Sequence, residues 1–344
     1  MERSWQSRLR RTLAGGLLLA LALPLSGCGQ KTTVTETELE PTTVMLDWYP
    51  NTNHTGLYVA VERGYFAAEG LEVEVLQSGE AGVEQAVGSG RVDFGFSSQE
   101  NATYALAEGV PILSIAAILQ HNTSAFASLK EAGIKTVKDF EGKRYGGWGS
   151  PSEAAVIQAV MAKHGADFSQ VETVTLGQAD FFATIGRAAD FEWIYYGWDG
   201  IEAERRGIEL NTIFLKDLDP VFDYYAPLLV TSQSLATNQP DKVAAFMRAL
   251  AKGYADALAD PAAGAEILLK YAPELNPDLV RRSQAFLAQV EKADKTEGRP
   301  YWGYQDQEVW ARYARWMYEA GLIANPVDAG QAFTNQFLPG AGGA

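Results

Sequence analysis

Segments typical of strands alternate with segments typical of helices from residue 43 to about residue 230. Repeated strand–helix–strand units of this kind predict an α/β fold. The run at 112–119 is almost continuously apolar, as expected for a parallel strand that is covered on both faces. The predicted strands are 43–46, 71–76, 92–96, 112–119, 143–147, 171–176, 191–196, 210–215 and 228–231. The predicted helices between them are 53–63, 83–87, 101–108, 151–164, 179–187 and 198–206.

The strand–helix pattern restarts after residue 137 and gives way to helices after residue 231. Two α/β halves followed by a helical C-terminal extension predict two lobes with a cleft between them. We place the crossings of the chain near 122–130 and 225–231, so that lobe 1 comprises residues 43–125 and 228–340 and lobe 2 comprises residues 126–227. The C-terminal helices are predicted at 240–258, 261–271, 276–293, 305–320 and 328–337.

The first 27 residues have the pattern of a secretion signal. Four arginines between residues 3 and 11 precede an apolar run at 13–25. A basic head before a short apolar run is typical of a signal peptide, because a membrane-spanning helix needs about 20 apolar residues. We therefore expect residues 1–27 to be removed on export.

The apolar run ends in the sequence Leu-Ser-Gly-Cys at 25–28, which resembles the bacterial lipobox. In a lipobox the cysteine is lipidated and becomes the new N-terminus. We therefore expect Cys28 to carry a lipid that anchors the protein to the cell membrane on its extracytoplasmic face, with residues 28–42 as a flexible polar tether. The alternative is a buried cysteine that follows small residues by chance.

Charge and cysteine content exclude several classes of protein. The chain has 28 Lys+Arg against 43 Asp+Glu, a formal charge of −15, which becomes −18 once residues 1–27, with four arginines and one glutamate, are removed. Such a chain is repelled by nucleic acid, so we expect no nucleic-acid partner. A single cysteine excludes a disulfide framework and cysteine-ligated zinc or iron–sulfur sites. Three histidines leave little material for a metal site, and we expect neither a metal nor a cofactor.

The loop after the first predicted strand is the first candidate for ligand binding. Ligands of open α/β sheets bind beyond the carboxyl ends of the strands, where loops lead into helix N-termini. Asp47, Trp48 and Tyr49 place two aromatic rings beside a carboxylate, which together can stack on a flat ring and hydrogen-bond its edge. Alternatively, Asn51 or Asn53 caps the helix while both rings pack in the core. For His54, a core or supporting role is as plausible as contact with a ligand.

Two more loops place short polar side chains at strand ends. Gln99 and Glu100 follow the strand at 92–96 and are candidate ligand contacts, although we expect Ser97 or Ser98 to cap the next helix. Asn122 follows the apolar strand near the first crossing and is a candidate too. The alternative for Asn122 is a hinge loop without a ligand.

The loop at 145–153 (YGGWGSPSE) has the most specific sequence. Ser150, Pro151 and Glu153 fit the N-cap, N1 and N3 positions of a capping box. Capping does not explain the glycines or the tryptophan. Glycines let the backbone approach a ligand closely, and exposed N–H groups can hold a polar edge. The candidate ligand contacts here are Gly147, Trp148, Gly149, Ser150 and, where capping leaves it free, Glu153.

The aromatic strand at 191–196 ends in Tyr195 and Tyr196, and Trp198 follows at the start of the next predicted helix. Aromatic strands usually belong to the core. Because this run ends at a helix start, we expect it to place a ring in the cleft, and we take Tyr195, Tyr196 and Trp198 as candidates.

Four stretches of this sequence resemble a known family, the thiamine-pyrimidine-binding family of solute-binding proteins, which serve ATP-binding-cassette importers. The likeness covers roughly residues 43–339 and implies a type II periplasmic-binding-protein fold that closes about a hinge on a planar nitrogen heterocycle. It also implies ligand contacts at Asp47, Trp48 and Asn122, at 147–150 and at the Tyr195–Tyr196 pair. The stretches are 47–56 (DWYPNTNHTG), 145–151 (YGGWGSP), 193–204 (WIYYGWDGIEAE) and 332–339 (AFTNQFLP).

The resemblance leaves the ligand open between riboflavin and formylaminopyrimidine, a thiamine precursor. We expect a monomeric, lipid-anchored binding protein that delivers its ligand to a membrane permease. Two alternatives are a heterocycle-metabolising enzyme and a ligand sensor. A fungal pyrimidine synthase of the same superfamily uses a cysteine-rich segment and histidines with iron. This chain has only Cys28, outside the predicted fold, so we expect no enzymatic activity.

Overall fold

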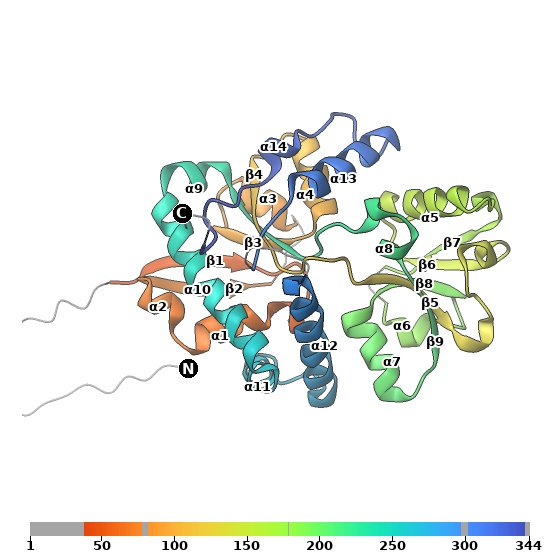
Figure 1. Ribbon diagram of the computed structural model, residues 1–344, viewed down its shortest axis with the longest axis horizontal. Helices are drawn as coiled ribbons and strands as arrows, with labels where there is room; N and C mark the ends of the chain where they lie inside the picture. Colours follow the sequence, from red (N-terminus) through yellow and green to blue (C-terminus); the bar gives the residue numbers. More distant parts are fainter. Residues whose placement is uncertain (1–37, 78–81, 178, 297–301, 341–344) are drawn as a thin grey trace, which may run out of the picture. The chain divides into compact units, whose positions relative to one another are not determined.

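The computed structural model describes residues 38–77, 82–177, 179–296 and 302–340 (Figure 1). Residues from Glu38 onward form one compact unit. The predicted signal peptide, Cys28 and most of the tether lie outside the described residues. We therefore describe the fold from Glu38 onward.

The first sheet has five strands in the order β2-β1-β3-β10-β4. Strand β1 pairs in parallel with both β2 and β3, whereas β10 runs antiparallel to its two neighbours. The sheet is therefore mixed, and its single antiparallel strand comes from late in the sequence. The strands are β1 (Glu40–Met45), β2 (Leu71–Leu76), β3 (Phe94–Ser97), β4 (Ile112–Ala117) and β10 (Leu228–Ser232).

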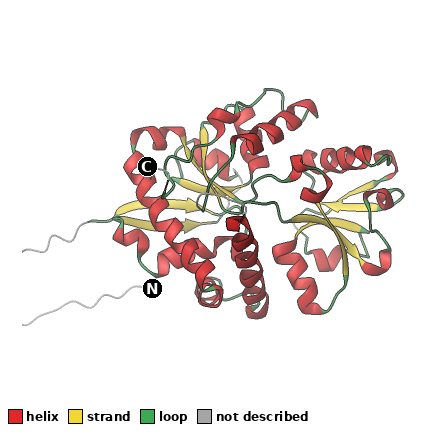
Figure 2. Ribbon diagram, viewed as in Figure 1, coloured by secondary structure: helices red, strands yellow, loops and turns green. Residues whose placement is uncertain are grey.

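Helices cover both faces of this sheet (Figure 2). One face packs Phe94, Phe96 and Leu229 against α1 (Thr55–Glu62), α2 (Tyr65–Ala68), α9 (Gln233–Asn238) and α10 (Pro240–Ala259). The other face packs Ile112, Leu228 and Val230 against α3 (Val83–Gly88), α4 (Gln99–Ala107), α13 (Gln307–Glu319) and α14 (Ala329–Ala332). Helices α11 (Pro261–Tyr271) and α12 (Pro277–Thr296) pack on each other, and α11 also packs on α1.

The second sheet also has five strands, in the order β7-β6-β8-β5-β9, and β5 runs antiparallel to both β8 and β9. Helix α5 (Pro151–Lys163) covers one face through Val156 and Val160, and α6 (Phe181–Thr184) covers the other. The strands are β5 (Ser124–Leu129), β6 (Arg144–Gly147), β7 (Glu172–Thr175), β8 (Phe191–Tyr195) and β9 (Leu210–Phe214). The remaining short helices are α7 (Ile201–Arg206) and α8 (Leu215–Leu218).

The chain passes between the sheets twice, after β4 and after β9, and hydrogen bonds tie the two passages together. The Nδ1 atom of His121 lies 2.6 Å from Oδ2 of Asp223. The backbone N–H of Asn122 donates to Oδ1 of the same carboxylate at 2.9 Å, and its side-chain Nδ2 donates to the carbonyl of Phe222 at 3.0 Å. The lobe boundaries given above remain a prediction.

The structure confirms the α/β class and corrects four elements. Strand β5 lies within the first predicted crossing, 122–130, where no strand was predicted; its small and polar residues carry little strand signal, and its place between β8 and β9 specifies it. Strand β4 pairs antiparallel with β10 and not in parallel, because an apolar run reports burial and not strand direction. The helices expected at 179–187 and 328–337 are shorter, Phe181–Thr184 and Ala329–Ala332. A bridge from Ile185 to Ala189 and another from Phe333 to Ser114 replace the missing turns.

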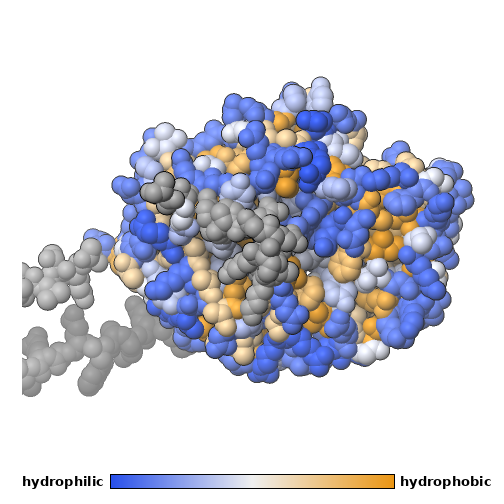
Figure 3. Space-filling view, in the orientation of Figure 1, coloured by the Kyte–Doolittle hydropathy of each residue, from blue (hydrophilic) through white to orange (hydrophobic). Residues whose placement is uncertain are grey.

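The surface drawn in Figure 3 is mostly hydrophilic, with apolar residues in smaller patches. In the part of the chain that the structure describes, no helix combines the length and hydropathy needed to cross a membrane.

Candidate ligand-binding site

The loop after β1 is organised around His54. The backbone N–H of Asn51 donates to Nδ1 of His54 at 3.2 Å, and Nε2 lies 2.8 Å from Oδ1 of Asp47. Because Nδ1 accepts a hydrogen bond, the ring proton sits on Nε2 and is donated to the carboxylate. The histidine is fully buried and packs edge-on against Phe96, with ring centroids 4.9 Å apart. The structure thus gives His54 the supporting role, since it holds Asp47 in place.

Asp47 has one carboxylate oxygen without a hydrogen bond in the described part of the chain. Its side chain is 31% exposed, and within the described residues no hydrogen bond reaches Oδ2. Trp48 and Tyr49 follow it in an edge-to-face pair, with ring centroids 5.9 Å apart, and are 47% and 66% exposed. The alternative that both rings belong to the core is therefore wrong.

In the structure, both the amide nitrogen and the amide oxygen of Gln99 and of Asn122 have protein partners. Gln99 is buried, donates to the carbonyl of Val309 at 3.2 Å and accepts from the N–H of Tyr225 at 3.1 Å. Asn122 is buried in the first crossing and accepts from both the N–H and the hydroxyl of Ser124. Their roles as ligand contacts remain predictions. Ser98 caps α4, as expected for one of the two serines.

Glu100 links a helix that covers the first sheet to a helix that covers the second. The hydroxyl of Ser152, at the start of α5, donates to Oε1 of Glu100, and Tyr224 donates to Oε2 at 3.3 Å. Burial raises the pKa of the Glu100 carboxyl, the hydrogen bonds from Ser152 and Tyr224 lower it, and the charge of Glu153 raises it further. Glu100 is therefore a contact between the α4 and α5 N-termini.

The 145–153 loop forms the predicted capping box, with Ser150 as N-cap, Pro151 at N1 and Glu153 at N3. Glu153 is 2% exposed, and both of its oxygens are hydrogen-bonded within the loop. Trp148 stands out from the loop at 40% exposure and packs edge-on against Trp193, with ring centroids 5.4 Å apart.

The aromatic residues after β8 fall into two groups. Tyr195 is 39% exposed, yet it lies deep enough that burial raises the pKa of its phenol, and the charges of Glu100 and Asp47 raise it further. Tyr196 instead donates to Glu204 at 2.6 Å and packs against Phe286. Trp198 is partly buried against the helices α11 and α12.

Ser283 of α12 joins two of the predicted loops and was missed by sequence reasoning. Its Oγ lies 2.6 Å from Oγ1 of Thr52 and donates to the carbonyl of Gly197. These partners are 231 and 86 residues away in sequence, and no local pattern marks the serine. The structure thereby fixes the Asp47 loop against the turn that follows Tyr195.

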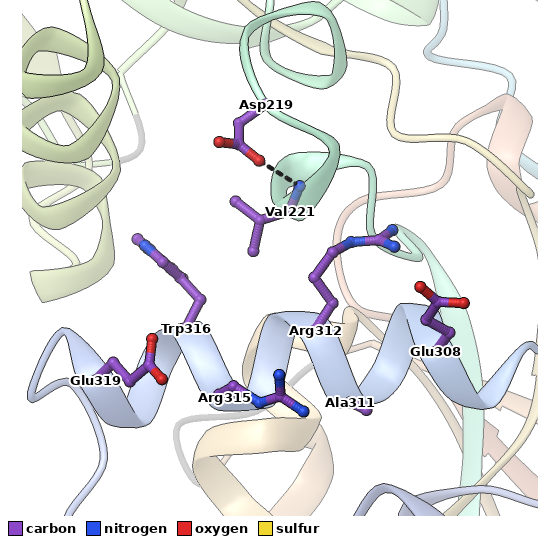
Figure 4. A pocket seen from close by; sticks show the side chains of 8 residues that line it. All are labelled: Asp219, Val221, Glu308, Ala311, Arg312, Arg315, Trp316 and Glu319. Atoms are coloured by element: carbon purple, nitrogen blue, oxygen red, sulfur yellow. Dashed lines mark hydrogen bonds between the residues drawn. The ribbon is translucent and has the colours of Figure 1, made fainter.

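A separate groove of about 420 Å³ lies between α13 and the segment that holds Asp219 and Val221 (Figure 4). Figure 4 shows Arg312 and Trp316 on the helix side, facing Val221. None of the predicted ligand contacts lines this groove. Within the described residues, no group of three or more His, Cys, Asp or Glu side chains could hold a metal ion.

Comparison with known proteins supplies the family. Residues 51–264 match the model of the NMT1/THI5-like family. The chain belongs to this family. The matched region contains every predicted ligand contact except Asp47, Trp48 and Tyr49, which lie just before it.

Family relatives include binding proteins and enzymes. The formylaminopyrimidine-binding protein of Halalkalibacterium halodurans is 29% identical over 93% of this chain and 97% of its own length. The riboflavin-binding protein RibY of Chloroflexus aurantiacus is 28% identical over 88% of this chain and 87% of its own. A 4-amino-5-hydroxymethyl-2-methylpyrimidine phosphate synthase of Legionella pneumophila is 26% identical over 86% of this chain and 92% of its own.

A solved structure confirms the fold of this NMT1/THI5-like chain. The alkanesulfonate-binding protein SsuA of Xanthomonas axonopodis pv. citri, bound to MOPS, superposes with a TM-score of 0.63 at 18% identity, over 86% of this chain and 99% of the other. The fold is therefore that of the type II periplasmic binding proteins, as the resemblance implied.

A pH-dependent stability is expected from Glu192 on β8. Burial raises the pKa of its carboxyl from 4.5 to about 7, and Oε1 has no hydrogen-bond partner in the described part of the chain. A carboxyl with a raised pKa stabilises the folded state below its unfolded pKa, and this contribution is lost as the pH rises through 7. Glu192→Gln cannot ionise, so its unfolding free energy should rise relative to wild type by about 2 kcal/mol between pH 5 and pH 8.

Urea unfolding at the two pH values measures this difference. Asp139→Asn is the matched control. Hydrogen bonds from the N–H groups of Lys135 and Thr136 lower the pKa of Asp139, so its contribution to stability is lost only at acidic pH and should not change between pH 5 and pH 8. A difference between Glu192→Gln and wild type that does not change with pH would contradict the assignment.

Proposed function

We propose that this chain is the extracytoplasmic solute-binding component of an ATP-binding-cassette importer and that it captures a flat nitrogen heterocycle of the B-vitamin class. The proposal rests mainly on the arrangement around Asp47. Four of the large apolar side chains that the described structure leaves exposed, Trp48, Tyr49, Trp148 and Tyr195, belong to the predicted loops. Exposed aromatic patches often mark ligand-binding grooves, and flat ligands stack on such rings.

The carboxylate of Asp47 complements these rings. Its free Oδ2 accepts a hydrogen bond and suits an amino or imide N–H on the ligand edge. Riboflavin and formylaminopyrimidine both carry such groups, and they are the ligands named for two relatives that align over most of this chain. We keep both as candidates.

We further propose that the protein does not catalyse a reaction. The two binding-protein relatives match it over a larger share of its length than the synthase does. The chain also has a single cysteine, at position 28.

Calorimetric titration of the purified chain with riboflavin and with formylaminopyrimidine tests the function. Binding of one of them, with a Kd in the micromolar range or below, is the expected result, and the melting temperature should rise with ligand concentration. A yellow, fluorescent preparation would identify a flavin directly. Failure of both ligands to bind or stabilise the chain would refute the proposed ligand class.

We also propose that Cys28 carries a lipid anchor, that residues 1–27 are removed, and that the anchored protein acts as a monomer beside a membrane permease. The basic head, the short apolar run and the position of the cysteine support this proposal. Cys28→Ala should release the protein from the membrane fraction into the soluble fraction, because the lipid supplies the anchor. Fractionation of expressing cells, followed by mass spectrometry of the N-terminal peptide, measures the change. An unmodified Cys28 in the wild-type protein would refute the anchor.

A further inference from the structure

The start of α5 surrounds one carboxylate with hydrogen-bond donors. The N–H of Trp148 donates to Oε1 of Glu153 at 3.1 Å, and the N–H groups of Gly149 and Ser150 donate to Oε2 at 2.7 Å each. The phenol of Tyr145 donates to Oε1 at 2.6 Å. Consecutive backbone N–H groups at a helix N-terminus make a site that favours anions. Here the anion is the chain's own side chain.

The loop is shaped to this carboxylate. A Cβ atom at Gly147 would lie 2.1 Å from Oε1 of Glu153, so only glycine leaves room for the side chain. Gly149 has a φ of +98°, a backbone conformation that favours glycine, and its own N–H and that of Ser150 both point at Oε2. The carboxylate is 2% exposed, and its donors are therefore unavailable to a second anion.

The occupied loop adjoins the proposed ligand contacts. Ser152, one residue before Glu153, donates to Glu100 of α4. The charges of Glu153, Glu100 and Asp47 all act on the phenol of Tyr195. Carboxyl groups from loops of both sheets therefore lie near Tyr195.

An unused donor lies beside the same loop. The indole Nε1 of Trp193 is buried and has no hydrogen-bond partner among the described residues, and its ring packs against Trp148. Buried donors nearly always have partners, so an acceptor from outside the chain is expected here. A carbonyl oxygen or a ring nitrogen of a ligand can accept this hydrogen bond.

We propose that Glu153 is a specificity-determining residue, which fills an anion-binding loop with the chain's own carboxylate and so restricts the proposed site to ligands without a phosphate or sulfonate group at that position. This inference rests on the proposed function, since it concerns the same site. The site should therefore bind the free vitamin or precursor more tightly than a related molecule that carries a phosphate.

Two measurements on the full chain test the inference. The first compares wild-type binding of riboflavin with that of riboflavin 5′-phosphate, and of formylaminopyrimidine with that of 4-amino-5-hydroxymethyl-2-methylpyrimidine phosphate, a pyrimidine that carries a phosphate ester. The ester should bind at least about tenfold more weakly, a difference of about 1.4 kcal/mol. Equal affinity for the ester would overturn the proposal.

The second measurement needs no vitamin, so it separates failure of this inference from failure of the proposed function. Glu153→Ala empties the loop, and millimolar sulfate should raise the melting temperature of this variant more than that of the wild type. Glu172→Ala is the control: Glu172 is exposed and its side chain accepts no hydrogen bond within the described residues, so its loss frees no donors and should leave the sulfate response unchanged.

Two more variants guard against a simple loss of folding. Glu153→Ser keeps a capping side chain while removing the charge, and should gain the sulfate response if Glu153→Ala fails to fold. Glu153→Asp keeps the charge and should retain the wild-type response. A folded Glu153→Ala or Glu153→Ser protein without any gain in sulfate response would overturn the proposal.

Discussion

Replacing Asp47 by alanine is expected to weaken binding of the heterocycle by about 30- to 1,000-fold, which corresponds to about 2–4 kcal/mol. A ligand N–H that faces Oδ2 would lose its charged acceptor and remain buried without a partner, which costs more than the loss of a neutral hydrogen bond. The rings of Trp48 and Trp148 would remain, so residual binding by stacking is expected. Calorimetric titration of the variant with the ligand that the wild type binds gives the ratio of the two Kd values.

Two variants show whether this effect comes from the carboxylate itself. His54→Phe keeps the ring packing against Phe96 but removes the donor to Asp47, so the carboxylate is retained but loses its fixed orientation. Its expected loss is about 3- to 30-fold, less than that of Asp47→Ala. Asp139→Ala removes a carboxylate that is not among the predicted contacts and should not change the Kd. Wild-type affinity in Asp47→Ala would mean that Asp47 does not touch the ligand.

Local sequence patterns predicted the parts of the candidate site that depend on neighbouring residues. The capping box at Ser150 and Glu153 follows from spacing within four residues and is confirmed. Whether Glu153 would be free of its capping role could not be predicted, because that depends on how the glycine loop curls around it. In the structure all of its hydrogen bonds are made within the loop.

Contacts between distant segments were not predictable from one sequence. Ser283 lies on an ordinary helical segment, and only the folded chain brings it to Thr52 and Gly197. The same holds for Ser152 and Glu100, which are 52 residues apart. Strand β5 was missed for a related reason, because its pairing with β8 and β9 decides its conformation more than its own residues do.

Gly253→Ala is expected to lower the unfolding free energy by about 3 kcal/mol, the upper end of the usual cost of overpacking. A Cβ atom at Gly253 would lie 2.1 Å from the carbonyl oxygen of Gly56 and 2.9 Å from the N–H of Ala60. Both contacts are with the backbone of α1, so no side chain can move aside to relieve them. Because α10 packs on α1 at this point, the two helices would have to separate. Urea unfolding of the variant and the wild type measures the loss.

Whether Gly253→Ala lowers or raises the unfolding free energy shows whether close packing or helix propensity dominates at this position. Glycine in a helix interior is about 1 kcal/mol less favourable than alanine, so sequence alone predicts that Gly253→Ala stabilises α10. Ala255→Gly, at an exposed position of the same helix, is the matched control and should lose about 1 kcal/mol through propensity alone. A stabilised Gly253→Ala protein would contradict the close approach of the two helices. A destabilised one should also bind ligand more weakly, because α1 begins directly after His54, and a displaced α1 would shift the histidine that holds Asp47.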